Sequence, residues 1–395
     1  MGRWLWVVAV VAACGEAGGA ADGSRDSEVA VPDVELEVES EAEDGLEDTP
    51  DEGSPDESSI DTTLDTDTVS PEDTEDAGEV ADTGGSDSLE TVEDISSPPV
   101  LSGWTWQTLP ELPRILQEHA TVVLEDEITL LGGFENLALI DSIVHYDPDT
   151  RVFRNGTPLP RALHHVNAAV VDGKLMVLGA LEGFAFTARG EVWALEDGVW
   201  KGRAAMPTGR QRGSAGVAVV GSDVFLVGGF RAGAVDDVDV YRGAEDRWER
   251  LADLPGARDH GGAVAVEGLI YAVGGRQGGI GAIEANLWRF DPAAPEAGWV
   301  ELPPMPTARG GFAHGVVHGR IIVVGGEGNA SSPSGVFPQA ELFDPATGRW
   351  YRLPDMPAPR HGMQAVALGG VLYVPGGADV EAFGATRTFQ ALVAP

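Results

Sequence analysis

A pair of glycines ends an apolar stretch at regular intervals along this 395-residue chain, and this repeat limits the possible folds more than any other feature. The first glycine of each pair lies 46 to 51 residues before that of the next. An aromatic residue, a proline and an arginine recur with the same period. The pairs, one of them degraded to Gly-Ala, are Gly132-Gly133, Gly179-Ala180, Gly228-Gly229, Gly274-Gly275, Gly325-Gly326 and Gly376-Gly377. A period of this length indicates six equivalent structural units.

Each unit has the pattern of four short strands. The first two strands are almost wholly small or aliphatic, as expected of strands covered on both faces. The turns between strands contain His318-Gly319 and an Asp-Pro-Ala-Thr-Gly-Arg stretch, and both are rich in turn-forming residues. In the fifth unit the predicted strands are Phe312–Val317, Arg320–Val324, Gln339–Phe343 and Trp350–Leu353. One such unit cannot bury both of its faces alone, and six arranged in a ring can.

The spacing, the glycine pairs and the trailing tryptophans resemble the kelch repeat, and residues 104–393 resemble a six-bladed kelch β-propeller. The resemblance implies an all-β fold. The chain enters this region at Trp104–Leu109, which has the pattern of an outermost strand, and residues 363–393 supply only three strands. We therefore predict that the N-terminal strand completes the last blade and leaves no free sheet edge.

The acidic residues are concentrated ahead of the repeats. The net charge is −39, and residues 22–100 hold 29 acidic residues against one basic residue, Arg25. Residues 15–103 contain no aromatic residue and cannot bury enough apolar surface to fold, so we predict a disordered acidic tether before a propeller at 104–395. Nucleic acid is excluded as a partner, because binding it requires a clustered basic surface.

The first 14 residues have the pattern of an export signal. Arg3 precedes an apolar run from Trp4 to Ala13, which is too short to span a bilayer. Val-Ala-Ala-Cys at 11–14 resembles a bacterial lipobox, which implies lipidation of Cys14, the only cysteine of the chain. We predict a monomer anchored by lipid in the cell envelope, at the outer membrane or surface of a bacterium. The alternative is a plain secretory signal cut near residues 17–21.

One arginine per unit precedes the first strand, in the loop where the outermost strand of one blade connects to the innermost strand of the next. Strand alternation places these loops on the same face as the loops that follow the glycine pairs. In kelch proteins, arginines at matching places bind acidic peptides, so the resemblance implies an acidic peptide, an acidic protein or an anionic glycan as partner. The alternative is that each arginine bonds only loop carbonyls or a neighbouring acid. The six candidates are Arg114, Arg161, Arg210, Arg258, Arg309 and Arg360.

Two other functions remain open from sequence. Sialic-acid mutarotases are six-bladed kelch propellers, and this resemblance suggests a carbohydrate-active enzyme. Proton transfer would then require side chains such as Glu118, Asp259, His260 and Glu327, which are predicted on the arginine face. The other is a structural scaffold without a small ligand. We expect a binding module rather than an enzyme, with no cofactor and no metal site, because the histidines occur about once per blade rather than at ligand spacing.

Overall fold

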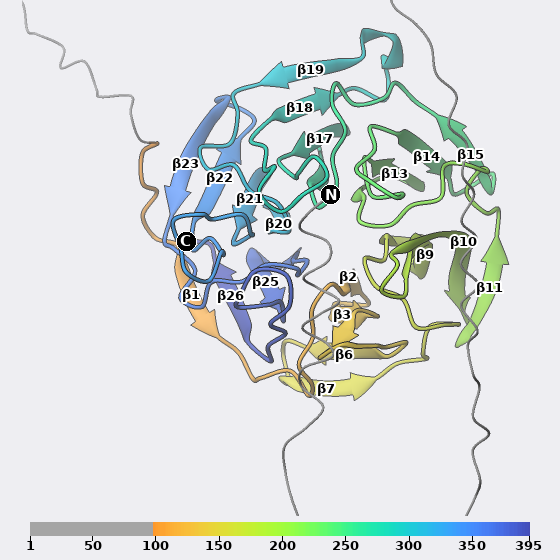
Figure 1. Cartoon of the computed structure of the whole chain (residues 1–395), viewed down its shortest axis with the longest axis horizontal. Coiled ribbons are helices and arrows are strands. Elements are labelled where there is room, and N and C mark those ends of the chain that lie inside the picture. The colour runs from red at the N-terminus through yellow and green to blue at the C-terminus, as the bar shows by residue number, and fades with distance from the viewer. Residues whose placement is uncertain (1–97) are drawn as a thin grey trace, which may run out of the picture. The chain divides into compact units, whose positions relative to one another are not determined.

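The computed structural model describes residues 98–395, which form six four-stranded antiparallel sheets arranged around a central axis (Figure 1). The region is all-β; a single 3-10 turn at Pro295–Ala297 is the one helical element among the described residues. The predicted signal and the predicted lipidation at Cys14 lie outside the described residues, and so does the predicted acidic tether at 15–103 apart from residues 98–103.

Each blade runs from an innermost strand a to an outermost strand d. The a strands are β2 (Ala120–Leu124), β8 (Ala168–Val171), β12 (Gly216–Val220), β16 (Gly262–Val266), β20 (Ala313–Val317) and β24 (Val366–Leu368). The b strands are β3 (Glu127–Leu131), β9 (Lys174–Glu182), β13 (Asp223–Val227), β17 (Leu269–Val273), β21 (Arg320–Val324) and β25 (Val371–Pro375). The c strands are β6 (Ile143–Asp147), β10 (Thr187–Glu196), β14 (Val238–Arg242), β18 (Leu287–Phe290), β22 (Ala340–Asp344) and β26 (Phe389–Val393). The d strands are β7 (Val152–Asn155), β11 (Val199–Arg203), β15 (Arg247–Arg250), β19 (Trp299–Leu302), β23 (Arg349–Leu353) and β1 (Thr105–Thr108).

The repeat predicted these strands to within one residue in the fifth blade: β21 is as expected, β22 is shifted by one residue, and β20 and β23 each differ by one residue at their start. The degraded Gly-Ala pair changes the second blade. Both glycines of an intact pair have positive φ, and there the chain leaves the sheet. In the second blade only Gly179 has positive φ, so β9 continues through Ala180 and forms a long hairpin with β10. A small extra hairpin, β4 (Phe134–Glu135) with β5 (Ala138–Leu139), lies in the first blade's loop.

The N-terminal strand closes the ring as predicted. The last sheet has the order β1-β26-β25-β24, and Thr105 pairs with Val393. β1 therefore lies at the outer edge of a blade whose three other strands come from the C-terminal end of the chain (Figure 1).

The hydrophobic core consists of layers between adjacent blades. Each of six buried clusters draws its side chains from two neighbouring sheets, for example Ile322 with Leu372, and Phe290 with Phe225. The tryptophans of the d strands connect the blades further: their indole Nε1 donates to a carbonyl in the exit loop of the preceding blade. The pairs are Trp106 with Pro354, Trp200 with Pro158, Trp248 with Ala204, Trp299 with Ala252, and Trp350 with Pro303, at 2.7–3.0 Å. The periodic tryptophan is therefore architectural.

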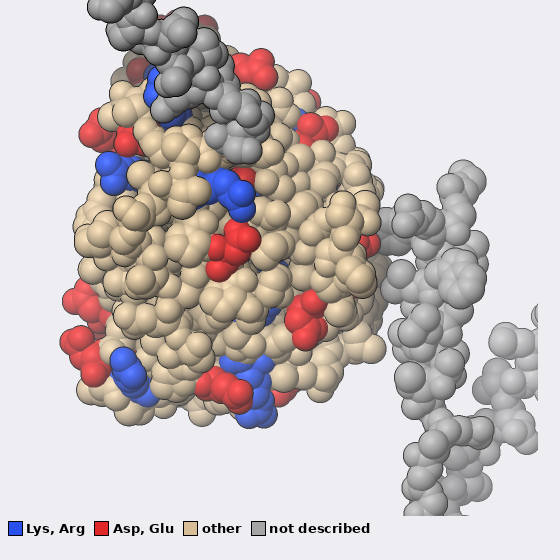
Figure 2. All heavy atoms as spheres, turned by 90° about the vertical axis from the view of Figure 1, so that its left-hand side faces the viewer, with Lys and Arg blue, Asp and Glu red and all other residues tan. Residues whose placement is uncertain are grey.

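The side of the propeller seen in Figure 2 carries isolated acidic and basic side chains on a mostly uncharged surface. On this side no single sign of charge dominates. Among the described residues, no helix is long and apolar enough to cross a membrane.

Candidate functional site at the mouth of the channel

The six blades meet at one structurally equivalent position, fourteen residues before the first glycine of each pair. The residue there has a positive φ of 49–62° in every blade. We call this set the inner ring, and its members are Glu118, His165, Ser214, His260, Gly311 and Gly362.

Backbone hydrogen bonds join the inner ring into a circle. The amide of each member donates to the carbonyl of the member in the preceding blade, at 2.6–2.9 Å. The exception is His260, whose amide donates to Ser214 Oγ at 3.2 Å. Because the backbone fixes all six positions, the side chains there are free to differ, and they do. Gly311 and Gly362 leave room: a Cβ on Gly362 would lie 2.4 Å from Glu118 Oε1.

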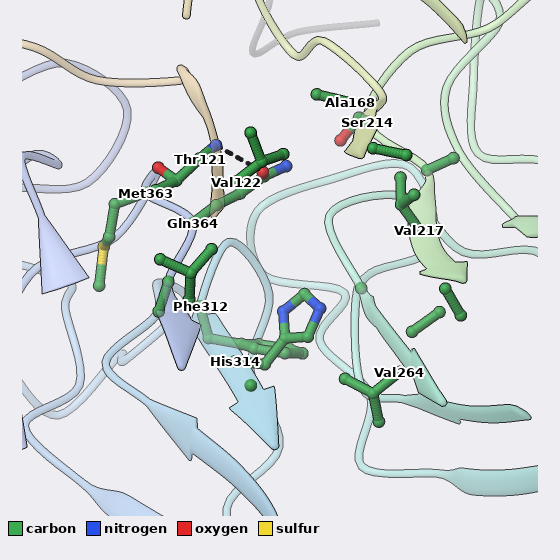
Figure 3. A pocket seen from close by; sticks show the side chains of 18 of the residues that line it. Thr121, Val122, Ala168, Ser214, Val217, Val264, Phe312, His314, Met363 and Gln364 are labelled. Carbon is green, nitrogen blue, oxygen red and sulfur yellow. Dashed lines mark hydrogen bonds between the residues drawn. The ribbon is translucent and has the colours of Figure 1, made fainter. Parts of the chain in front are cut away.

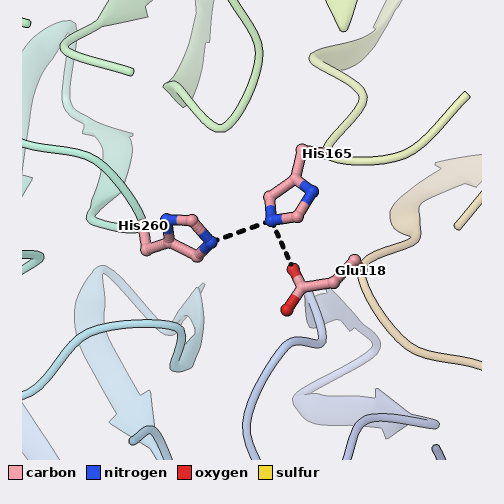
Figure 4. A group of neighbouring side chains, drawn as sticks. All are labelled: Glu118, His165 and His260. Carbon is pink, nitrogen blue, oxygen red and sulfur yellow. Dashed lines mark hydrogen bonds and ion pairs between the residues drawn. The ribbon is translucent and has the colours of Figure 1, made fainter. Parts of the chain in front are cut away.

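Three inner-ring side chains converge on the axis (Figure 4). His165 Nε2 lies 3.0 Å from Glu118 Oε2 and 2.8 Å from His260 Nε2. The three come from the loops before the a strands of the first, second and fourth blades. Their side chains are nearly inaccessible, with the carboxylate of Glu118 the most exposed at 12%.

A second layer surrounds this group. The residue before each inner-ring member bridges to the residue after a glycine pair, and in the fourth blade these are Asp259 and Arg276. The carboxylate of Asp259 bonds His260 Nδ1, and Arg276 Nε donates to Asp259 Oδ1 at 2.8 Å. Arg276 also pairs with Glu327, and its Nη2 donates to His260 Nε2 at 3.0 Å. Arg276 thus connects the acids of two blades.

The environment sets the protonation of these groups. Burial works to raise the pKa of Glu118, but the adjacent His165 holds it well below its usual value. Burial opposes ionisation of Asp259 as well, yet His260 and Arg276 lower its pKa to about 2. Burial, reinforced by Arg276, lowers the pKa of His260. The carboxylates are therefore ionised at neutral pH, and His260 is neutral.

A central cavity of about 350 Å³ opens beside this group. Its wall consists of the a strands, and its polar members below the inner ring include Thr121, Gln364 and His314 (Figure 3). The amide of Thr121 donates to Gln364 Oε1 at 3.0 Å, across the boundary between the first and last blades. The rest of the wall is largely valine and alanine, so the ionisable chemistry is concentrated at the mouth.

The arginines predicted from sequence fall into two sets. Arg258, Arg309 and Arg360 lie sixteen residues before a glycine pair, and their side chains are buried, with 0–6% exposed. The guanidinium of Arg309 pairs with Glu341 at 2.6 Å, and that of Arg360 donates to Gln390 at 2.8 Å and to three carbonyls. Arg258 bonds Asn286 and lies over the Trp288 ring. Each is held inside its own blade.

Arg114, Arg161 and Arg210 lie two positions earlier, eighteen residues before a pair. Arg114 and Arg161 are about one-third exposed and pair with Glu135 and with Glu182 and Glu191. Arg210 is 15% exposed and bonds Asp237 and Asp239. The six arginines therefore do not converge on one mouth, because each has partners in its own blade. A binding role for them stays a prediction.

Sequence reasoning missed three features of this face. Arg212 occupies the buried position in the third blade, with Nη1 2.7 Å from Asp239, and the sixteen-residue distance to Gly228 would have identified it. Arg276 is the residue after a glycine pair. The third feature is an aromatic group beside His164: Phe186 contacts the His164 ring, and Phe184, 58% exposed, stacks on Phe134. No spacing in the sequence marked Phe184.

Taken together, the fold and the mouth define a closed six-bladed β-propeller with ionisable side chains at one end of its channel. The KLHDC2/KLHL20/DRC7 Kelch-repeats domain matches residues 199–377. Kelch-like protein terF of Aspergillus terreus is 35% identical over 309 residues, covering 72% of this chain and 66% of that protein. Human Kelch-like protein 23 is 28% identical over 189 residues, 47% of this chain and 33% of its own length. The propeller is therefore a kelch-repeat domain.

The structure of YjhT has the same fold, with a TM-score of 0.61 at 14% identity, over 73% of this chain and 97% of that one. This chain spans about two thirds of the terF protein and about one third of the next curated relatives.

Buried neutral histidines make stability depend on pH. Burial lowers the pKa of His314 and His119 to about 4 and that of His164 to about 3, whereas unfolded histidine titrates near 6.5. Between pH 6.5 and 4.5 the unfolded chain binds more protons, so the unfolding free energy falls as pH falls, by roughly 1 kcal/mol per pH unit for each histidine. Urea unfolding of the wild type and His314→Gln should give a shallower dependence in the variant; equal slopes would contradict this.

Proposed function

We propose that this chain is an exported, lipid-anchored kelch propeller that binds an acidic segment of a partner protein on the loop face of its first two blades. Kelch domains generally mediate protein interactions, which supports a binding module. The anchor rests on the sequence around Cys14. It is checked by fractionation: a Cys14→Ala variant that stays in the membrane fraction would contradict it.

The observation that carries the binding site is an exposed Phe184 near the acidic partners of Arg114 and Arg161. Phe184 stacks on Phe134 at 5.7 Å, next to Glu135, the partner of Arg114. Glu182, the partner of Arg161, lies two residues before Phe184. An exposed ring near two ion pairs with partly exposed guanidiniums offers stacking together with carboxylate recognition, a combination typical of interaction sites.

The test is fluorescence anisotropy of the full chain with a labelled Asp/Glu-rich peptide. Changing Arg114 and Arg161 together to Gln should weaken binding about 2- to 30-fold, because each exposed charge pair contributes about 0.2–1 kcal/mol. The matched control is Arg247→Gln, which removes a carboxylate-paired arginine, 49% exposed, from the start of β15, next to the turn between β14 and β15 on the opposite face. The acidic residues 22–100 compete equally in all variants.

Equal affinities in the wild type and the double variant would exclude this site. A second candidate, sugar chemistry at the mouth, is favoured by the Asp259–His260 contact, since a carboxylate that orients an imidazole suits proton transfer. Polyuronate and sialic acid are therefore tested separately as ligands in the same experiment. Faster sialic-acid mutarotation that His260→Gln abolishes would favour the enzyme. If the protein binds none of these probes, the remaining hypothesis is a structural scaffold without a small ligand.

A further inference from the structure

The loop-face mouth holds a group whose atoms are arranged to accept rather than to donate. Glu118 offers one carboxylate oxygen, and His165 and His260 each offer Nε2; the three ligand atoms lie within 4.8 Å of one another. They come from three different blades (Figure 4), and hydrogen bonds of the main chain hold all three positions.

The outer partners determine which nitrogen of each ring carries its proton. His164 Nε2 lies 3.1 Å from the carbonyl of Gly183, which can only accept, so His164 keeps its proton there and Nδ1 is an acceptor. His165 Nδ1, 2.5 Å away, must then donate to it, which leaves His165 Nε2 with a lone pair.

His260 has the same arrangement. Its Nδ1 donates to the carboxylate of Asp259, and its Nε2 therefore also presents a lone pair. Arg276 Nη2 donates to that lone pair at 3.0 Å. With the proton placed on Nδ1, His165 Nε2 and Glu118 Oε2 lie 3.0 Å apart and each presents a lone pair to the other. A cation bound between them would satisfy both atoms.

The charges around the mouth give the same result. Glu118, Asp259 and Glu327 are carboxylates with 2–12% of their side chains exposed, and Arg276 is the cation beside them. His361 Nδ1 also faces Glu327, at 3.2 Å. Among the carboxylates and guanidiniums named here, the three acidic side chains outnumber the one basic side chain by two. An unbalanced buried charge is costly, and one divalent cation removes the excess.

We propose that Glu118, His165 and His260 bind a divalent transition-metal ion of the Zn²⁺ type at the centre of the inner ring. Two imidazole nitrogens and one carboxylate oxygen form a ligand set suited to Zn²⁺ rather than to Ca²⁺ or Mg²⁺, which prefer oxygen. Asp259 and His164 orient the two rings from outside, as supporting groups do in zinc sites. The ion displaces the Arg276 contact to His260, and Arg276 keeps Asp259 and Glu327. The remaining coordination position faces the central cavity, which all three ligands line.

The site is independent of Arg114, Arg161 and Phe184, so it goes beyond the proposed acidic-segment binding. The competing occupant is a proton on His165, which would also satisfy Glu118. The two are distinguished by metal titration.

The test is isothermal titration of Zn²⁺ into the untagged, chelator-treated full chain at pH 7.5, with Co²⁺ absorption as a second readout. We expect one high-affinity ion per chain and a tetrahedral or five-coordinate Co²⁺ spectrum. Glu118→Gln, His165→Gln and His260→Gln should each weaken Zn²⁺ binding about 100-fold or more, and Asp259→Asn about 10- to 100-fold.

His361→Gln is the matched control, because it removes another buried mouth histidine that lies outside the three ligands. It should bind Zn²⁺ as the wild type does. Circular dichroism confirms folding of every variant, and weak sites in the acidic residues 22–100 are common to all of them. A folded wild type without high-affinity Zn²⁺ binding, or ligand variants that bind equally well, would overturn the proposal and assign the contact to a proton.

Discussion

Replacing Arg309 by Leu is expected to lower the unfolding free energy by about 3–5 kcal/mol, measured by guanidinium unfolding of the full chain. The reason is that Glu341, 2% exposed, would lose the guanidinium 2.6 Å away and remain charged inside the blade. Thr307 Oγ1, which donates to Glu341 at 2.6 Å, cannot neutralise that charge.

The first blade supplies the control. There the positions of Arg309 and Glu341 are occupied by Leu116 and Val144, an apolar pair. The double variant Arg309→Leu/Glu341→Val copies that pair and should recover most of the lost stability, since a buried ion pair replaced by packed apolar groups is often neutral. Arg114→Leu, in an exposed pair, should cost less than about 1 kcal/mol. A small cost for Arg309→Leu, together with loss of acidic-peptide binding, would show that Arg309 serves a ligand.

Gly325→Ala is the second large effect. A Cβ at Gly325 would lie 2.3 Å from the carbonyl oxygen of Arg360, in the next blade, and the residue has a φ of +68°. Gly319 has nearly the same φ, +73°, but no atom within 4 Å of the added Cβ. Gly319→Ala should therefore cost only the left-handed strain, about 1–2 kcal/mol, and Gly325→Ala should cost roughly 1–3 kcal/mol more.

The difference between the two variants isolates close approach from backbone conformation, and thermal and guanidinium unfolding both measure it. Equal losses would mean that the glycine pairs are needed only for their φ. The unequal result would mean that the pair also lets adjacent blades touch.

The architecture could be predicted from sequence because the residues that produce each blade recur with the same period as the blades. The glycine pair and the tryptophan have the same physical role in five of the six blades, and the a and b strands in all six, so the copies reinforce one weak motif. The closing strand could be predicted from strand counting alone. The second blade could not be predicted in detail, because the loss of one glycine at Ala180 lengthens a hairpin in a way that period alone does not indicate.

The site was only partly accessible from sequence for the opposite reason: it depends on what does not repeat. Glu118, Asp259, His260 and Glu327 were placed on the correct face, but their contacts depend on Arg276, which no repeat marks. The six predicted arginines were assumed to occupy equivalent positions in the repeat. Arg210 and Arg212 show that there are two such positions, one partly exposed and one buried. Spacing along the chain gave no metal site, because the three candidate ligands are separated by whole blades and meet only around the axis.

The pairing of Thr105 with Val393 has a consequence for how this molecule is made. Among the described strands β1 is synthesised first, and its partner β26 is synthesised last. Contacts so distant in sequence are formed late and slowly. Until then the sixth blade lacks its partner strands for β1, and the six blades cannot form a closed ring. The propeller therefore cannot close until residues 389–393 have been synthesised, whereas each of the other five blades is built from one continuous segment of the chain.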